Sequence, residues 1–193
     1  MLKLYGSIVS PFVRRVRLLL HGHEHEFVLT DIYDDAIRQE VMKQNPSMKI
    51  PMLVDNETVV FDSGVIYRYL REIMHWSPLS WEQENLVTTI NAANDSLVTI
   101  LMSSRSGLDI TDKTSLLFKL QYERLDIGFK ALDDAVSDGK FSGWDYPEIC
   151  LYCLLDWMVF RELYDIHQHT HLKRFWQQHQ SDPAAIDTDP RGA

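Results

Sequence analysis

The stretch that decides the fold is NPSMKIPMLV (residues 45–54), which is followed shortly by Asp62-Ser63. A proline at the start of a strand cannot donate a hydrogen bond to the sheet. If the bond between Ile50 and Pro51 is cis, the chain turns sharply and the N–H and C=O groups of Ile50 point outward. These groups are then able to pair with an extended peptide as an added strand does. Asp62 and Ser63 fall at the start of a predicted helix, where free N–H groups favour anions.

Outward from this stretch, the first part of the chain alternates strand and helix patterns. Apolar strands are predicted at residues 2–5, 26–29, 52–54 and 59–61. Helices are predicted at residues 11–21 and 34–44, and from Asp62 or Ser63 to residue 74. The order βαβ, helix, ββα indicates a small α/β layer with a mixed sheet.

The second part of the chain, after residues 75–79, carries only helical patterns. Long helices are predicted over residues 81–103, 111–137 and 147–163, with a short one over 171–179. Asp145 and Glu148 form a predicted capping box before an apolar run that indicates a buried helix of a bundle. The tail from Ser181 onward is predicted to fray. We therefore divide the chain into an α/β domain (residues 1–76) and an all-helical domain (residues 80–193).

The composition of the chain limits the classes of partner it is expected to bind and the compartment in which it is expected to work. The 193 residues carry a formal net charge of −9, which argues against nucleic acid as the main partner. No apolar run reaches the roughly 20 residues that span a bilayer, and the N-terminus reads as a strand rather than a signal peptide. The only cysteines, Cys150 and Cys153, lie in a predicted buried helix, which favours core packing over redox or metal chemistry. A cytoplasmic protein without a metal, a membrane or a nucleic-acid partner is expected.

Two histidine groups, His21-x-His23-x-His25 and His167-x-His169-x-His171, are candidate metal ligands. Each trio shares a face only if its segment is extended, since alternate residues of a strand point the same way. The residues before the second strand read as a loop, and the later trio falls at a helix junction. No metal site is therefore predicted.

Several segments together resemble the cytosolic glutathione transferases. The segment SPFVRRVR (residues 10–17) is similar to the serine-type members, notably tau and zeta. The resemblance is strongest over residues 3–20 and 45–70, and weaker over the helices. It implies a thioredoxin-like α/β N-terminal domain (βαβ-α-ββα) followed by an all-α helical bundle domain. It also implies a homodimer that uses reduced glutathione as co-substrate against a small hydrophobic electrophile.

The resemblance assigns the catalytic role to Ser10 and glutathione contacts to Phe12 and Ile50. A thiolate is a far better nucleophile than a thiol, whose pKa is about 8.5. The Ser10 hydroxyl, just ahead of a helix, is implied to stabilise the thiolate of glutathione, with help from the helix dipole. The main chain of Ile50 is implied to pair with the cysteinyl residue of the tripeptide.

The two ends of glutathione are assigned in the same way. Ser63, through its hydroxyl and N–H, is implied to bind the γ-glutamyl carboxylate, and Asp62 to help hold that end. Lys49 or Arg38 is the candidate partner of the glycyl carboxylate.

Each assignment has a structural alternative. Ser10 and the Asp62-Ser63 pair are also typical helix caps, and Lys49 is also read as an ordinary surface charge. At the level of the whole protein, a noncatalytic transferase-like binding or regulatory module remains open, because a fold does not fix a function. A thiol-disulfide oxidoreductase is disfavoured because Ser10 stands where that chemistry needs a cysteine.

Overall fold

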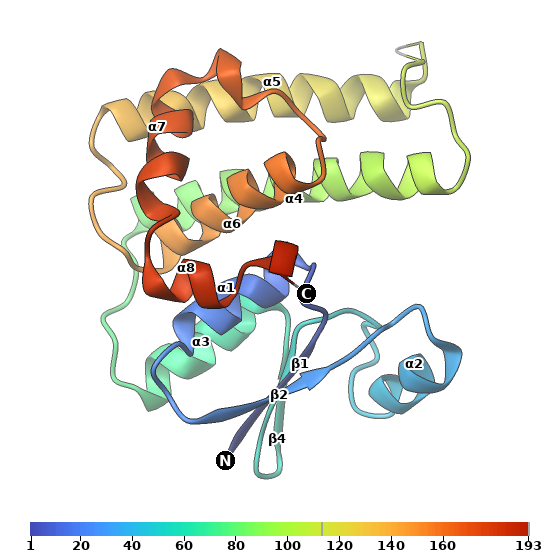
Figure 1. Ribbon diagram of the computed structural model, residues 1–193, viewed down its shortest axis with the longest axis vertical. Coiled ribbons are helices and arrows are strands. Elements are labelled where there is room, and N and C mark those ends of the chain that lie inside the picture. The colour runs from blue at the N-terminus through green and yellow to red at the C-terminus, as the bar shows by residue number, and fades with distance from the viewer. Residues whose placement is uncertain (113, 193) are drawn as a thin grey trace. The chain divides into compact units, whose positions relative to one another are not determined.

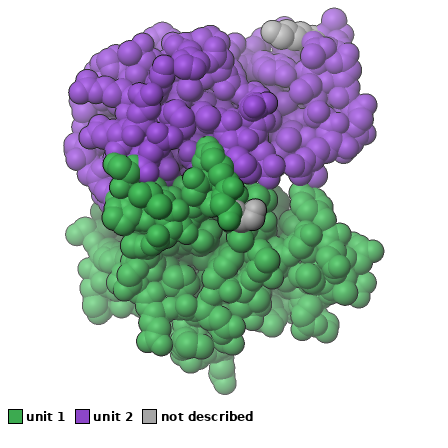
Figure 2. Space-filling view, viewed as in Figure 1, with its two compact units in different colours: residues 1–78, 181–193 green, residues 79–180 purple. Residues whose placement is uncertain are grey.

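The computed structural model describes residues 1–112 and 114–192 (Figure 1). The chain forms two compact units, which Figure 2 shows in different colours. The first unit comprises residues 1–78 together with 181–193, and the second comprises residues 79–180. The sequence predicts domains at residues 1–76 and 80–193. Whether each of these parts folds independently stays a prediction.

The first unit holds the mixed sheet that the sequence predicts. Its elements are, in order, β1 (Leu2–Gly6), α1 (Pro11–Leu19), β2 (His25–Leu29), α2 (Asp35–Met42), β3 (Met52–Asp55), β4 (Thr58–Phe61) and α3 (Ser63–Ile73). The strands lie in the order β2-β1-β3-β4. β1 pairs with β2 in parallel and with β3 antiparallel, and β3 pairs antiparallel with β4. The predicted order βαβ-α-ββα is thus confirmed.

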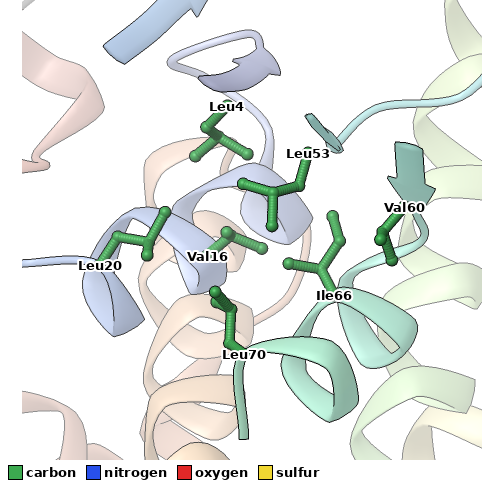
Figure 3. Packing of buried hydrophobic residues seen from close by; sticks show 7 residues of the cluster. All are labelled: Leu4, Val16, Leu20, Leu53, Val60, Ile66 and Leu70. Atoms are coloured by element: carbon green, nitrogen blue, oxygen red, sulfur yellow. The ribbon is translucent and has the colours of Figure 1, made fainter. Parts of the chain in front are cut away.

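The core of the first unit lies between the sheet and the two helices α1 and α3. Figure 3 shows side chains from β1, β3 and β4 directed toward side chains from the two helices. They form one buried cluster of Leu4, Val16, Leu20, Leu53, Val60, Ile66 and Leu70. Figure 1 shows α2 apart from α1 and α3. Burial of this apolar surface fixes the ends of α1 and α3 relative to the strand ends.

The second unit consists of α4 (Trp81–Arg105), α5 (Leu116–Ser137), α6 (Tyr146–Phe160), a 3-10 turn (Ile166–Gln168) and α7 (Thr170–His179). α4 packs against both α5 and α6, and α7 packs against α5 and α6. α6 is buried along nearly its whole length, as its continuous apolar sequence predicts. Across the described residues, none of the helices combines the length and apolarity that a membrane crossing needs.

The start of α5 differs from the prediction of a helix from residue 111, because local side-chain bonds occupy that segment. The Asp109 carboxylate accepts hydrogen bonds from the Thr111 N–H (2.9 Å) and hydroxyl (2.6 Å). The Asp112 carboxylate accepts the same pair from Thr114, at 2.9 and 2.6 Å. Such turns compete with helix formation, so the helix begins only at Leu116. Residue 113, within the predicted helix, lies outside the described residues.

The capping box predicted for α6 has its residues at the expected positions but lacks the expected hydrogen bonds. Asp145 occupies the N-cap position, and a proline follows in the first turn, but the Asp145 side chain makes no capping hydrogen bond. The Glu148 Oε1 atom instead accepts from the Gly143 N–H at 3.3 Å. Burial and a hydrogen bond to the Glu148 carboxyl raise the pKa of Asp145 to about 7. The Glu148 carboxyl therefore bonds the loop before the helix and does not close a reciprocal cap with Asp145.

The end of the chain is ordered, which corrects the prediction of a frayed tail from Ser181. It forms α8 (Pro183–Asp187) and a 3-10 turn (Pro190–Gly192) that belong to the first unit. Ala184, Ala185 and Thr188 are buried. The Asp182 carboxylate caps α8 by accepting from the N–H groups of the two alanines. Composition predicted fraying because it does not register contacts that arise only in the folded state.

Candidate functional site

The strand register gathers three segments at one edge of the sheet. Tyr5, near the end of β1, pairs with Met52, the first residue of β3. Met52 in turn pairs with Phe61, the last residue of β4. The segment after β1 leads to Ser10, the segment before β3 contains Ile50, and the segment after β4 begins α3. The predicted site residues therefore come from segments that leave the sheet at the same edge.

Ser10 is the N-cap of α1. Its backbone is extended (φ −84°, ψ 125°), and its hydroxyl oxygen accepts a hydrogen bond from the Val13 N–H at 3.3 Å. The main-chain N–H of Ser10 donates to the Ser7 carbonyl at 3.2 Å. A hydroxyl has one hydrogen to donate and two lone pairs to accept, so the cap leaves the O–H donor available to a ligand. The capping role and the proposed thiolate contact are therefore compatible.

Ile50 presents a main-chain amide edge. The peptide bond between Ile50 and Pro51 is cis, as hypothesised from the sequence. Within residues 1–112 and 114–192, neither the N–H nor the C=O of Ile50 has a hydrogen-bond partner. The residue is half-buried, so these groups need a partner from water or from a ligand.

Asn45 holds the loop that carries Ile50, a role that the sequence analysis missed. Its side chain is fully buried, at 0% exposure. Its Nδ2 donates to the Lys49 carbonyl at 2.7 Å, while its Oδ1 accepts from the Ser47 N–H at 3.0 Å and the Ser47 hydroxyl at 2.6 Å. These bonds fix the chain immediately before Ile50. The available signal was an amide side chain in an Asn-Pro pair, since asparagine satisfies turn backbones through its side chain.

The start of α3 divides two roles between adjacent residues. Asp62 is the N-cap, and its Oδ1 accepts from the N–H groups of Gly64 (2.9 Å) and Val65 (3.2 Å). Its φ of 75° lies in the left-handed region, an uncommon conformation for a non-glycine residue that often marks functional sites. Ser63 follows as the first helical residue, with 3% of its surface exposed.

The polar groups of Ser63 are candidates for binding a ligand. In the described part of the chain, neither its hydroxyl nor its N–H has a hydrogen-bond partner. The first N–H groups of a helix lack intrahelical acceptors and carry partial positive charge. A carboxylate fits this position chemically.

Arg38 and Lys49, the two candidate partners of the glycyl carboxylate, differ in how far other residues already occupy their charged groups. Arg38 donates to the carbonyl of Ile32, which precedes α2, at 3.2 Å and pairs with Asp35 in α2, so its guanidinium already has partners within the protein. Lys49 is exposed, and its ammonium makes no ion pair with any described residue. Phe12, in the first turn of α1, is half-buried, with the Arg15 guanidinium carbon 4.7 Å from its ring centroid. Of the two cations, Lys49 is the one whose charge has no partner among the described residues.

The other chemistry-bearing residues play structural parts. Cys150 and Cys153 are both fully buried on α6, which confirms the prediction of core packing. Among described residues, no group of at least three His, Cys, Asp or Glu side chains is arranged to hold a metal ion. Arg17 in α1 is held by main-chain groups. It donates to the main-chain carbonyls of Asp187 and Thr188 within the first unit, each at 3.4 Å.

Known proteins match this chain in sequence and in fold. Residues 4–77 match the family described as "Glutathione S-transferase, N-terminal domain". Glutathione S-transferase 3 of Zea mays is 42% identical over 72 residues, covering 36% of this chain and 32% of that protein. The uncharacterized GST-like protein YibF of Escherichia coli K12 is 29% identical over 178 residues, covering 84% of each protein.

A solved structure matches at nearly full length. The crystal structure of a glutathione S-transferase from Methylobacillus flagellatus KT with GSH bound has a TM-score of 0.85 at 22% identity, covering 98% of this chain and 100% of that one. This match confirms the predicted fold class, a thioredoxin-like α/β domain followed by a helical one. In sequence, the match spans only about a third of the length of the Zea mays relative and of several others. The roles of Ser10, Phe12, Lys49, Ile50, Asp62 and Ser63 stay predictions.

Proposed function

We propose that this protein is a glutathione transferase of the serine type and that the sheet edge described above binds reduced glutathione. The observation that carries the proposal is the convergence of an unpartnered Ile50 amide, an unpartnered Ser63 hydroxyl and the Ser10 O–H at one edge of the sheet. The match of residues 4–77 to the N-terminal domain of glutathione transferases supports the same ligand.

The tripeptide is matched to the site by its chemistry. Its extended main chain pairs with the N–H and C=O of Ile50, as an added strand would. Its γ-glutamyl carboxylate accepts from the Ser63 hydroxyl and N–H at the start of α3. The Asp62 Oδ2 atom, which the cap does not use, accepts from the γ-glutamyl ammonium. Lys49 attracts the glycyl carboxylate, and Phe12 supplies apolar contact.

The reaction then requires no nucleophile from the protein. The Ser10 O–H donates to the sulfur of glutathione, and the start of α1 adds favourable dipoles, so the thiolate is stabilised and the thiol proton leaves to solvent. The thiolate sulfur attacks the electrophilic carbon of a small hydrophobic substrate. A carbon–sulfur bond forms and the leaving group departs with its bonding electrons. The protein contributes positioning and a lowered thiol pKa.

A cytoplasmic homodimer is part of this proposal. The homodimer is supported by a row of exposed apolar side chains along α5 in the second unit. In this row Leu116 is 68% exposed and Ile127 is 72% exposed. Exposed apolar side chains grouped on one face are typical of interaction surfaces. The reducing compartment is supported by the two buried cysteines, Cys150 and Cys153, which form no disulfide.

A noncatalytic glutathione-binding module is the second candidate. The observation that favours it is the capping bond of Ser10, because that bond explains the serine without any catalytic role. In such a module the Ile50 and Ser63 contacts would serve for binding alone. The two candidates share a binding site and differ in what Ser10 does.

Calorimetric titration with reduced glutathione tests the binding site first. We expect saturable binding to one site per chain, weakened by Ser63→Ala, since a charge-assisted hydrogen bond contributes about 1.5–3 kcal/mol. Ser80→Ala, which removes the cap of α4 in the other unit, is the matched control and should leave the affinity unchanged. Conjugation of a generic aryl halide then separates the candidates: turnover that Ser10→Ala lowers more than binding supports the transferase. Binding without turnover supports the module.

A further inference from the structure

One face of α1 is bound by the end of the chain. Arg14 and Arg17 on α1, and His21 two residues beyond the end of α1, all contact residues 185–188. Arg14 donates from Nε to the Thr188 hydroxyl oxygen at 3.2 Å and from an Nη to the Ala185 carbonyl at 2.9 Å. His21 Nε2 lies 3.0 Å from the Asp187 Oδ2 atom. Figure 1 shows α8 beside α1.

These contacts explain why α8 forms. A helix of five residues is too short to be stable alone in water, whatever its cap. Its last carbonyls have no intrahelical donors. Arg14 supplies a donor to the Ala185 carbonyl, and Arg17 supplies donors to the carbonyls of Asp187 and Thr188. The segment therefore depends on α1 for its hydrogen bonds.

The dependence runs in the other direction as well. Arg14 is 3% exposed, and a buried guanidinium is costly unless acceptors surround it. The Thr188 hydroxyl donates to the Ala184 carbonyl at 2.7 Å, so its oxygen is oriented to accept from Arg14. Burial, together with the neighbouring charge of Arg14, lowers the pKa of Arg17. The C-terminal segment thus supplies hydrogen-bond acceptors to the buried or partly buried guanidinium groups of Arg14 and Arg17 on α1.

The segment and the sheet hold α1 by different faces. On the sheet side, Val13 and Val16 are fully buried, and Gly6 at the end of β1 lies directly against Val13. The segment binds the face that carries Arg14 and Arg17. Ser10 is the cap at the N-terminal end of the helix that is held in this way. A helix held on two faces keeps the direction of its cap hydroxyl fixed.

We propose that residues 182–192 form a strap that holds α1, with Thr188 and Arg14 as positioning residues for the Ser10 hydroxyl. The part that concerns Ser10 rests on the proposed function above. The strap bonds to Arg14, Arg17 and His21, and no hydrogen bond joins a described strap residue to Lys49, Ile50, Asp62 or Ser63. It should therefore govern the state of the bound thiol more than the affinity for the tripeptide. Sequence reasoning placed this segment in the helical domain and gave it no role.

The test uses Thr188→Val, which removes the oxygen that accepts from Arg14 and keeps the side-chain shape. Asp182→Ala is a second variant, since it loosens α8 from its other end by removing its cap. Thr170→Val, an exposed change on α7, is the matched control. The first readout is amide hydrogen exchange of residues 14–19 without ligand. The second is the pKa of the thiol of bound glutathione, followed by thiolate absorbance. The third is the affinity for S-methylglutathione, which has no free thiol.

Loss of one hydrogen bond of this kind is expected to speed exchange in α1 about threefold to tenfold. In the same two variants the thiol pKa should rise, whereas the affinity for S-methylglutathione should change less than about twofold. Unchanged exchange in both variants would overturn the strap. Faster exchange with an unaltered thiol pKa would overturn the positioning of Ser10. If the unmodified protein binds no glutathione, the proposed function and the link to Ser10 both fail, and the exchange data still decide whether the strap exists.

Discussion

A single methyl group at Gly6 is predicted to destabilise the first unit, because β1 meets α1 at this point. A Cβ atom at residue 6 would lie 2.5 Å from Val13 Cγ1 and 2.6 Å from Val13 Cγ2. Val13 is 0% exposed and packed on all sides, so it cannot turn away without moving α1. Overpacking of this kind costs about 1–3 kcal/mol. We therefore expect Gly6→Ala to lower the free energy of unfolding by about 2 kcal/mol.

Denaturant unfolding of four proteins measures this clash: the unmodified chain, Gly6→Ala, Val13→Ala and the double variant. Because Val13→Ala removes both clashing Cγ atoms, the double variant should be more stable than the sum of the single effects predicts. Gly128→Ala in α5 is the control, since a Cβ there meets nothing within 4 Å. It should stabilise the chain by up to about 1 kcal/mol through helix propensity. A Gly6→Ala protein as stable as the unmodified chain, or strictly additive effects, would refute the packing argument.

Three further predictions concern the loop, the acid pair and the α5 surface. Asn45→Ala should weaken glutathione binding in calorimetry, because the Lys49 carbonyl loses its buried donor and the loop before the site loosens; unaltered affinity would contradict this role. The pKa of Asp145, raised from 3.8 to about 7, means that the folded state binds more protons than the unfolded state between these values. Stability should therefore fall as pH rises from about 4 to 8, and Glu148→Gln should flatten the fall measured by denaturation at several pH values. Ile127→Glu should shift the protein toward monomer in light scattering if the exposed α5 face is the dimer contact; an unchanged mass would exclude that face.

Much of the fold could be predicted because its signals are local. Alternating short apolar runs predicted the strands, and the apolar run after Asp145 predicted the burial of α6. The errors came from contacts between distant or competing groups. The Asp109 and Asp112 turns displace the start of α5. The order of the chain after Ser181 depends on hydrogen bonds from Arg14 and Arg17, about 170 residues upstream. The residues around Arg14 and Arg17, and those around the C-terminal segment, give no local sequence signal of this contact.

The candidate site could be predicted in outline because its parts are backbone features tied to recognisable residues. Pro51 at the start of a strand predicts the outward-pointing amide groups of Ile50, and the Asp62-Ser63 pair predicts the start of α3. The division of labour between Asp62 and Ser63 could not be predicted, since either residue is able to cap a helix. Asn45 was missed because its importance lies in its burial and in three hydrogen bonds, which sequence does not display.

The proposed function depends on the Ser10 hydroxyl stabilising the thiolate of glutathione at this sheet edge. The most direct measurement is the pKa of the bound thiol, followed by thiolate absorbance against pH, in the unmodified protein, Ser10→Ala and Ser10→Thr. We expect a thiol pKa well below the free value of about 8.5. Ser10→Ala should raise it by about one to two pH units, because a hydrogen bond to a charged group contributes about 1.5–3 kcal/mol. Ser10→Thr, which keeps the O–H donor, should restore most of the effect. A bound thiol that titrates like free glutathione in all three proteins would contradict the claim.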